Sequence, residues 1–428
     1  MNEAQRARAI AWFVFAAVTV AAYGNFYVYD SIGPVADLLQ RQRGFSDTQI
    51  GMLNAIYSIP NVILVLVGGI LVDRFGAARM LFGTTAVCLA GAALTALSPG
   101  FATMAAGRLL FGIGAETFNI ATLAAVAEYF TGRNLAFAMG LNLSISRAGS
   151  FSADMSPAWF AKAYAGGWQP PLIIAMLIAA TSFAAAACYF WIDRRAHAKA
   201  KSDAAPTAQP FRFADLLGFG PAYWFLLILC VLWYGVILAF RSTFSIKYFQ
   251  HAHGLSLAAA GEMNSYVFLA AVFATPAFGW LCDRIGRYAP MLAFGALLLP
   301  IAIVIMAATE WSLWIATVLI GVSFSLVPAV MWPLTSKLVA PSRFGTALGL
   351  MWVIQNAGIA GANVAAGWLN DRAGASAQNP AGYQPMMIFF GVMSALGFGF
   401  ALLLWLTAGR RRHEALPAVG EAVPSNMT

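Results

Sequence analysis

The sequence predicts an all-α membrane protein with twelve transmembrane helices in two pseudo-symmetric six-helix halves, and three observations lead to this prediction. Of the 428 residues, 61% are hydrophobic and only 10% are charged, a balance that is not typical of soluble domains. Apolar stretches long enough to cross a bilayer recur along the whole chain. One glycine-containing motif occurs at corresponding places in the two halves.

Each expected span is an apolar stretch at least as long as the ~20 residues that cross a bilayer as a helix. The only long polar stretch is rich in Ala, Pro and basic residues, a composition typical of a linker, and it separates spans six and seven. The expected spans are residues 9–39, 47–72, 78–98, 102–130, 135–160, 168–192, 222–248, 256–282, 288–308, 311–339, 344–370 and 384–406. The expected domains are the N-terminal half (1–192), a cytoplasmic linker (193–221), the C-terminal half (222–406) and a cytoplasmic tail (407–428).

Basic residues predict the orientation. With both termini in the cytoplasm, 17 of the 25 Lys and Arg residues lie on the cytoplasmic side, five on the opposite side and three within spans. Short cytoplasmic loops of membrane proteins carry such an excess of Lys and Arg. We therefore expect cytoplasmic termini, and the compact loops indicate the inner cell membrane. The net charge of +8 follows from this topology, so we expect no nucleic-acid partner.

Spans four and five form a hairpin with one charge deep in each arm. Glu116 lies 15 residues before Thr131, and Arg147 lies 13 residues after Asn134. At a rise of about 1.5 Å per residue, both lie roughly 20 Å from the shared turn, near the middle of the membrane. Charges at this depth are costly and usually functional. We expect a polar substrate site here, and a static ion pair between the two helices is the alternative.

The motif G-x-x-x-D-R-x-G closes span two at residues 69–76 and span eight at residues 279–286, and a third copy closes span eleven at residues 367–374. Its glycines allow helices to approach closely, and its aspartate can interact with a neighbouring helix end or pair with a base. We expect a cytoplasmic gate that forms and breaks as the halves move, with static packing as the alternative. The expected gating residues are Gly69, Asp73, Arg74, Gly76, Glu128, Arg133, Gly279, Asp283, Arg284, Gly286 and Arg287.

The repeated motif resembles the hallmark loop of the major facilitator superfamily, and Arg108 with Gly112 and Gly114 resembles that superfamily's span-four motif. The resemblance covers nearly the whole chain. The stretches GRLLFGIGAETFNIA and LNLSISRAGS further resemble the major facilitator superfamily domain-containing protein 1 family, which comprises lysosomal dipeptide transporters of animals. This narrower resemblance implies that Glu116 and Arg147 hold the two ends of a dipeptide, and the compact loops favour a bacterial relative.

The residues themselves also suit a zwitterion. Arginine offers a planar fork for a carboxylate, and the carboxylates of Glu116 and Asp30 can receive an ammonium group. Asp30 can instead belong to an extracellular gate, and Asp154 can also belong to that gate. The predicted substrate-binding residues are Glu116, Arg147, Asp30, Tyr23, Tyr27, Tyr57, Asn119, Trp332, Gln355, Asn356 and Arg241.

We therefore expect a monomeric secondary transporter in the lipid bilayer that moves a small zwitterionic solute, a dipeptide in the favoured reading, by alternating access. The alternatives are a proton-coupled carrier of organic anions or drugs, and a membrane sensor or scaffold that does not transport. We expect no enzyme activity, no cofactor and no metal site, because Walker loops and metal-ligand spacings are missing. His251 and His253 are expected as solvated residues of an external loop.

Overall fold

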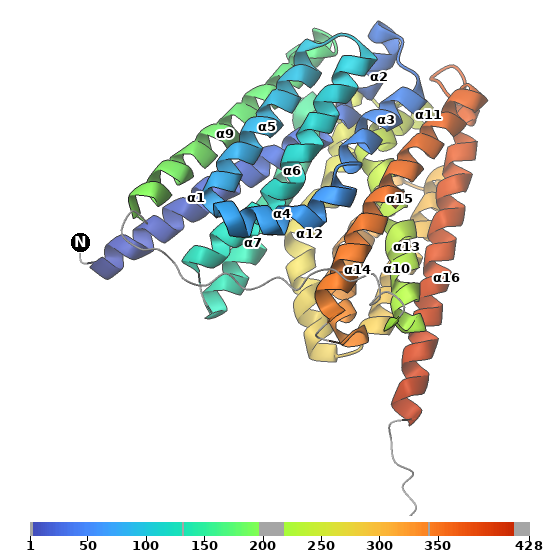
Figure 1. Cartoon of the computed structure of the whole chain (residues 1–428). Coiled ribbons are helices and arrows are strands. Elements are labelled where there is room, and N and C mark those ends of the chain that lie inside the picture. The colour runs from blue at the N-terminus through green and yellow to red at the C-terminus, as the bar shows by residue number, and fades with distance from the viewer. Residues whose placement is uncertain (1–2, 131, 197–217, 341–342, 415–428) are drawn as a thin grey trace, which may run out of the picture.

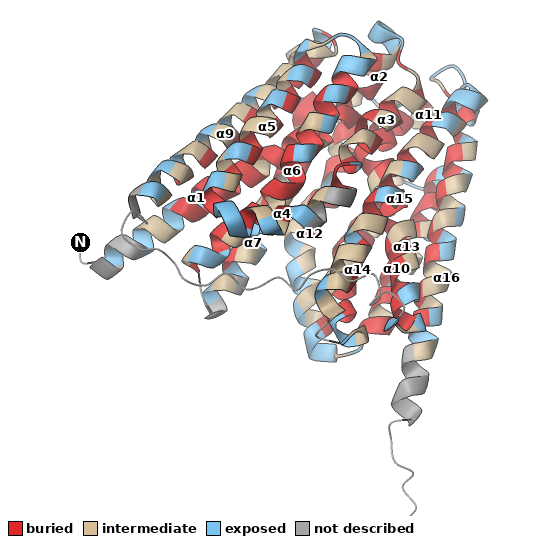
Figure 2. Ribbon diagram, in the orientation of Figure 1, coloured by how far each residue is buried: buried red, intermediate tan, exposed pale blue. Residues whose placement is uncertain are grey.

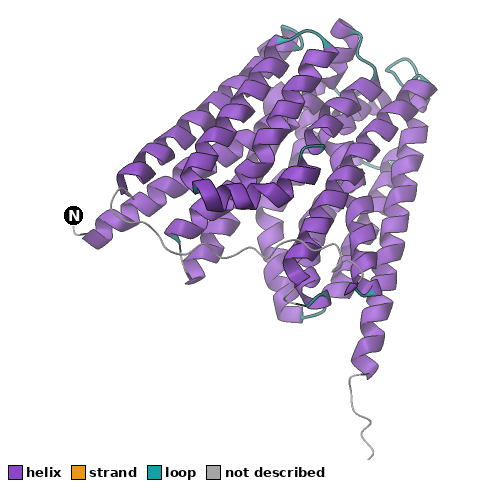
Figure 3. Cartoon of the chain, in the orientation of Figure 1, coloured by secondary structure: helices purple, strands orange, loops and turns teal. Residues whose placement is uncertain are grey.

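The computed structural model describes residues 3–130, 132–196, 218–340 and 343–414, and within these residues every regular element is a helix (Figures 1 and 3). The first half contains α1 (Glu3–Asp30), α2 (Ile32–Arg43), α3 (Asp47–Ser58), α4 (Asn61–Phe75), α5 (Ala77–Leu97), α6 (Phe101–Tyr129), α7 (Gly132–Trp159), α8 (Ala161–Ala165) and α9 (Gln169–Ala196).

The second half begins after residues 197–217, so most of the expected linker lies outside the described residues. It contains α10 (Pro221–Ala239), the π-helix η3 (Phe240–Phe244), α11 (Ser245–His253), α12 (Leu257–Ile285), α13 (Tyr288–Ala308), α14 (Leu313–Leu338), α15 (Phe344–Ala373), the 3-10 helix η5 (Pro380–Tyr383) and α16 (Gln384–Glu414).

Nine helical stretches among the described residues are long and apolar enough to cross a membrane. The other three expected spans are α3 with α4, α7 and α15. The helix of span two is broken at Ile59 and Pro60, because proline lacks the N–H that an uninterrupted helix requires. Arg147 in α7 and Gln355 in α15 illustrate why the other two stretches are less apolar. These helices carry polar side chains of the site described below.

The two halves lie closest together at one end of the molecule, and their helices diverge toward the other end (Figure 1). We call the diverging end, where α1 begins and α16 ends, the terminal side. The opposite end, which holds α2 and α11, is the far side. Across the halves, α7 packs against α12 and α3 packs against α15.

Glycines permit the close contact between α3 and α15. A Cβ atom at Gly51 would lie 2.3 Å from the carbonyl oxygen of Asn363, and one at Gly367 would lie 2.3 Å from that of Asp47. No side chain fits at such distances, so the two backbones touch at both positions. Gly367 is the first glycine of the third motif copy, which therefore contributes to the contact between the halves.

Figure 2 shows the buried residues gathered inside each half and exposed residues along the outer helix faces. Many of the exposed side chains are large and apolar. Phe273, Leu406 and Trp311, for example, are 72%, 64% and 63% exposed. A soluble protein rarely exposes so much apolar surface, whereas lipid covers it in a membrane.

Candidate functional site

A cavity of about 560 Å³ lies between the two halves and is lined by both of them. This volume is within the usual range of small-molecule sites. Three predicted residues, Tyr23, Tyr27 and Arg241, are not among its lining residues. The predicted residues that do line it are Asp30, Tyr57, Glu116, Asn119, Arg147, Trp332, Gln355 and Asn356.

Glu116 and Arg147 line this cavity as an unpaired acid and an unpaired base. The Glu116 side chain, in α6, is 6% exposed, and Arg147, in α7, is partly buried. Neither side chain forms a hydrogen bond or an ion pair with any described residue. The static ion pair is therefore absent from this structure. Because a shielded charge without a partner is costly, each group is suited to receive an oppositely charged group of a ligand.

Aromatic rings hold the guanidinium of Arg147 in place. Its Cζ atom lies 5.4 Å from the ring centre of Phe26, 5.8 Å from that of Phe268 and 5.1 Å from that of Phe324. Cation–π contacts attract the guanidinium without using its N–H groups. The arginine therefore retains its full set of hydrogen-bond donors for a ligand.

The second half supplies aromatic and amide side chains to the cavity. The rings of Trp332 and Trp352 stack at 5.2 Å, and the Asn61 amide of the first half donates a hydrogen bond of 3.2 Å to Asn356. Our sequence-based prediction missed Trp352 and Asn61, together with Tyr29 and Tyr234, all of which line the cavity. The break before Asn61 was the one available signal, because helix breaks in membranes occur where backbone faces protein or a cavity.

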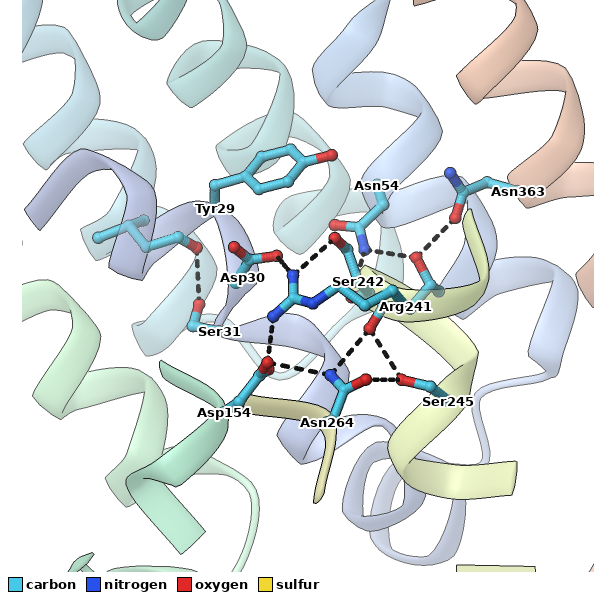
Figure 4. Close-up of polar contacts among 12 residues, drawn as sticks. Tyr29, Asp30, Ser31, Asn54, Asp154, Arg241, Ser242, Ser245, Asn264 and Asn363 are labelled. Atoms are coloured by element: carbon cyan, nitrogen blue, oxygen red, sulfur yellow. Dashed lines mark hydrogen bonds and ion pairs between the residues drawn. The ribbon is translucent and has the colours of Figure 1, made fainter. Parts of the chain in front are cut away.

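Arg241 forms a buried network at the far side of the molecule (Figure 4). Its guanidinium donates to Asp30 at 2.8 Å and forms an ion pair with Asp154, which also accepts a 3.0 Å hydrogen bond from Asn264. The three charged side chains are at most 2% exposed. The acids come from α1 and α7, whereas the arginine comes from η3. These ion pairs therefore join the two halves, as the predicted gate role of Asp30 and Asp154 requires.

The π-helix η3 supplies carbonyl groups to this junction. A π-helix breaks the regular i→i−4 hydrogen-bond pattern, which leaves carbonyls free for other partners. The Arg241 carbonyl accepts hydrogen bonds from Asn264 (3.1 Å) and Ser245 (2.8 Å). The Ser242 carbonyl accepts a bond of 3.3 Å from Asn54 of α3.

Arg108 supports the first-half side of the same junction. Its guanidinium donates to the carbonyls of Val28, Tyr29 and Leu53 at 3.1–3.2 Å and to the Asn54 side chain at 2.7 Å. The first two carbonyls belong to the last turn of α1, where intrahelical donors are lacking. Arg108 therefore fixes the break between α1 and α2 and orients Asn54 toward the second half.

An ion pair and a histidine–carboxylate contact join α2 and α3 to α11. Lys247 pairs with Asp47, and Nε2 of His251 lies 2.9 Å from Asp37. His251 also lies 2.7 Å from the hydroxyl of Tyr383. The expectation that His251 is a solvated loop residue is therefore wrong. It lies in α11 and is 8% exposed, because α2 of the other half covers it with a matching carboxylate.

Asp371 of the third motif copy caps α3 across the two halves. Its carboxylate accepts hydrogen bonds from the backbone N–H groups of Asp47 (2.7 Å) and Thr48 (2.8 Å). These N–H groups belong to the first turn of α3, where the helix dipole also favours a negative charge. The aspartate of this motif thus interacts with a helix end of the opposite half, on the far side.

We expect Asp371→Asn to weaken closure of the far side by about 1 kcal/mol, because the substitution removes the negative charge at the start of α3. The measurement is the distance distribution between spin labels at Lys162 and Gln378, two exposed far-side positions in different halves. The variant is expected to populate longer distances. The matched control is Glu310→Gln, which neutralises an exposed far-side carboxylate of the second half. Identical distributions for Asp371→Asn and the wild type would contradict this role.

On the terminal side, two predicted gating acids each accept a hydrogen bond from a tyrosine of their own half. Asp283 accepts a hydrogen bond of 2.6 Å from Tyr288, and Glu128 accepts one of 3.2 Å from Tyr189. Asp73 is exposed. The Arg133 side chain lies outside the described residues, so its predicted contact remains a prediction. Of the other predicted residues, Arg74 and Arg284 lie over Phe75 and Trp280. Gly76 and Gly286 adopt positive φ at the ends of α4 and α12, and Arg287 follows Gly286. Gly69 and Gly279 lie inside the same two helices.

Comparisons with known proteins agree with this architecture. The family model described as Major Facilitator Superfamily matches residues 14–261 and, a second time, residues 237–425. The chain is 29% identical to "Lysosomal dipeptide transporter MFSD1" of Homo sapiens over 398 residues, which cover 90% of this chain and 83% of that protein. It is 27% identical to "Probable nitrate/nitrite transporter NarK2" of Mycobacterium tuberculosis over 63% of this chain and 66% of that protein.

Solved structures share the same fold. A bacterial homologue of the human lysosomal transporter Spinster, in an inward-facing and unoccupied conformation, aligns with a TM-score of 0.75 at 16% identity over 94% of this chain and 98% of that one. The nucleoside transporter NupG aligns with a TM-score of 0.74 at 12% identity over 91% of this chain and 99% of that one. With the family model matching nearly the whole chain, this multi-pass membrane protein belongs to the major facilitator superfamily of transporters.

Proposed function

We propose that this transporter carries dipeptides, with Arg147 binding the C-terminal carboxylate and Glu116 binding the N-terminal ammonium. The observation that carries the proposal is the pair of unpartnered charges, of opposite sign, that line one cavity. A free dipeptide supplies both missing charges, whereas a monovalent ion would supply only one. The similarity to the MFSD1 dipeptide transporters points to the same substrate class.

We further propose that the termini are cytoplasmic, that the protein resides in the cell membrane, and that this conformation opens toward the cytoplasm. The distribution of basic residues supports the orientation. With cytoplasmic termini the far side faces outward, and the ion pairs that join the halves cluster on that side. The likeness to an inward-facing solved structure supports the conformation.

In this mechanism the dipeptide neutralises Glu116 and Arg147 of the first half, and its remaining surface contacts the second half, so that the two halves close around it. Closure of the terminal side then requires new contacts between the halves, and we propose that the gating residues around Asp73 and Asp283 form them. Opening of the far side requires loss of the Arg241 ion pairs and of the Asp371 cap. Alternating access therefore exchanges one set of contacts between the halves for another.

The test is a thermal-shift screen of the purified protein, followed by uptake into proteoliposomes. We expect free dipeptides to stabilise the protein, by about 2.7 kcal/mol at a concentration 100 times the Kd, and to be taken up. N-acetylated and C-amidated dipeptides are expected to stabilise it far less. Stabilisation by nitrate or by organic acids, but not by dipeptides, would overturn the proposal in favour of an anion carrier that uses Arg147. Binding without uptake would favour a sensor.

A further inference from the structure

The charges of the cavity all come from one half. Its acidic and basic lining residues are Asp30, Glu116 and Arg147, from α1, α6 and α7. The lining residues that the described part of the second half contributes carry no charge. They are mainly apolar and aromatic, with two amides in α15. A substrate in this cavity therefore meets its charge partners on one side and an uncharged surface on the other.

Three aromatic residues of the second half form a continuous strip, which we call the aromatic wall. Tyr234 of α10 lies 6.4 Å from Trp332 of α14, and Trp332 stacks on Trp352 of α15 at 5.2 Å with an interplanar angle of 17°. Trp352 lines the cavity and is 38% exposed, so part of its side chain is accessible. Such surfaces favour aromatic and large apolar groups.

The aromatic wall and Arg147 line the same cavity. Tyr234, at one end of the wall, and Arg147 are both among its lining residues. The guanidinium also touches the ring of Phe324, which lies on the same half as the wall. A carboxylate bound to Arg147 is therefore placed at the edge of the wall, and the side chain on the adjacent Cα atom is the one that reaches it.

We propose that the aromatic wall receives the side chain of the C-terminal residue of the dipeptide and selects large uncharged side chains there. The proposal rests on the dipeptide function and deepens it. A bulky apolar side chain at this position removes apolar surface from water and contacts the Trp332 ring. An acidic side chain at the same position finds no cation on the wall, and an unpaired charge away from water is costly.

The test compares dipeptides of the same composition in reversed order. We expect alanyl-phenylalanine to bind the wild-type protein about 10-fold more tightly than phenylalanyl-alanine, as measured by titration calorimetry. Alanyl-alanine is expected to bind with an affinity near that of phenylalanyl-alanine, and alanyl-glutamate more weakly than either. The reversed pair controls for overall hydrophobicity, because both members contain the same atoms.

Trp332→Leu is expected to reduce the 10-fold preference to about twofold, and Trp332→Phe to retain an intermediate preference. The control is Trp314→Leu, in the same helix but on its outer surface, where Trp314 is 45% exposed and does not line the cavity. This control is expected to keep the full preference. Equal binding of the reversed pair, or equal ratios in all variants, would overturn the aromatic wall and leave dipeptide transport intact. If no dipeptide binds the wild type, both proposals fail.

Discussion

Arg147→Lys is expected to weaken the binding of dipeptides with a free C-terminus by about 10- to 150-fold. Lysine keeps the positive charge but loses the planar fork, and a charge-assisted hydrogen-bonded contact contributes about 1.5–3 kcal/mol. The lysine side chain is also shorter, so its ammonium does not reproduce the contacts of the guanidinium with the rings of Phe26 and Phe324, and this adds to the loss. The measurement is the Kd of the purified variant for free and C-amidated forms of one dipeptide.

The amidated peptide distinguishes a binding role from a structural one. It makes little use of Arg147, so it is expected to bind weakly to the wild type and to lose little more in the variant. Glu116→Gln is expected to give the mirror pattern, with N-acetylated peptides as the insensitive ligands. If free and amidated peptides lose affinity by the same factor in Arg147→Lys, the arginine shapes the cavity and does not bind the carboxylate.

Arg241→Gln is expected to lower the free energy of unfolding by about 3–5 kcal/mol, because Asp30 and Asp154 then remain buried without their cation. The measurement is unfolding of the purified protein in detergent. The matched control is Arg74→Gln, which replaces an exposed arginine and is expected to change stability by less than about 0.5 kcal/mol.

A second substitution tests the cause of this loss. Combining Arg241→Gln with Asp154→Asn removes one of the two stranded charges, so the double variant is expected to be more stable than Arg241→Gln alone. A double variant that is less stable than the single one would contradict a mechanism based on unpaired charge. It would indicate instead that Arg241 acts mainly through its packing on the Phe268 ring, whose centre lies 3.5 Å from its Cζ atom.

The architecture was predictable because its signals are local. Span lengths, the repeated motif and the distribution of basic residues each depend on short stretches of sequence, and the predicted fold class is confirmed. The hairpin that carries Glu116 and Arg147 is also a local signal, because it depends on one short stretch of sequence. Two charges at equal depth on consecutive helices are expected to lie near one site, and both charged residues line the cavity.

The faces of the helices were not predictable in the same way. A helix that is apolar on all sides gives no amphipathic pattern to indicate which side points inward. Tyr23, Tyr27 and Tyr29 all lie in α1, and only Tyr29 lines the cavity. The partners of Arg241 could not be predicted from the sequence for another reason. Asp30 and Asp154 are 211 and 87 residues away in sequence, so only the packing of the two halves brings them together.

The far-side network has a consequence for the evolution of this chain. Its charges sit on three different helices, yet none is tolerable without the others, since each is buried from water and lipid. Whether a substitution at one of these positions is tolerated therefore depends on which residues occupy the other two. We expect homologues to inherit Arg241, Asp30 and Asp154 as a set, or to have replaced all three together.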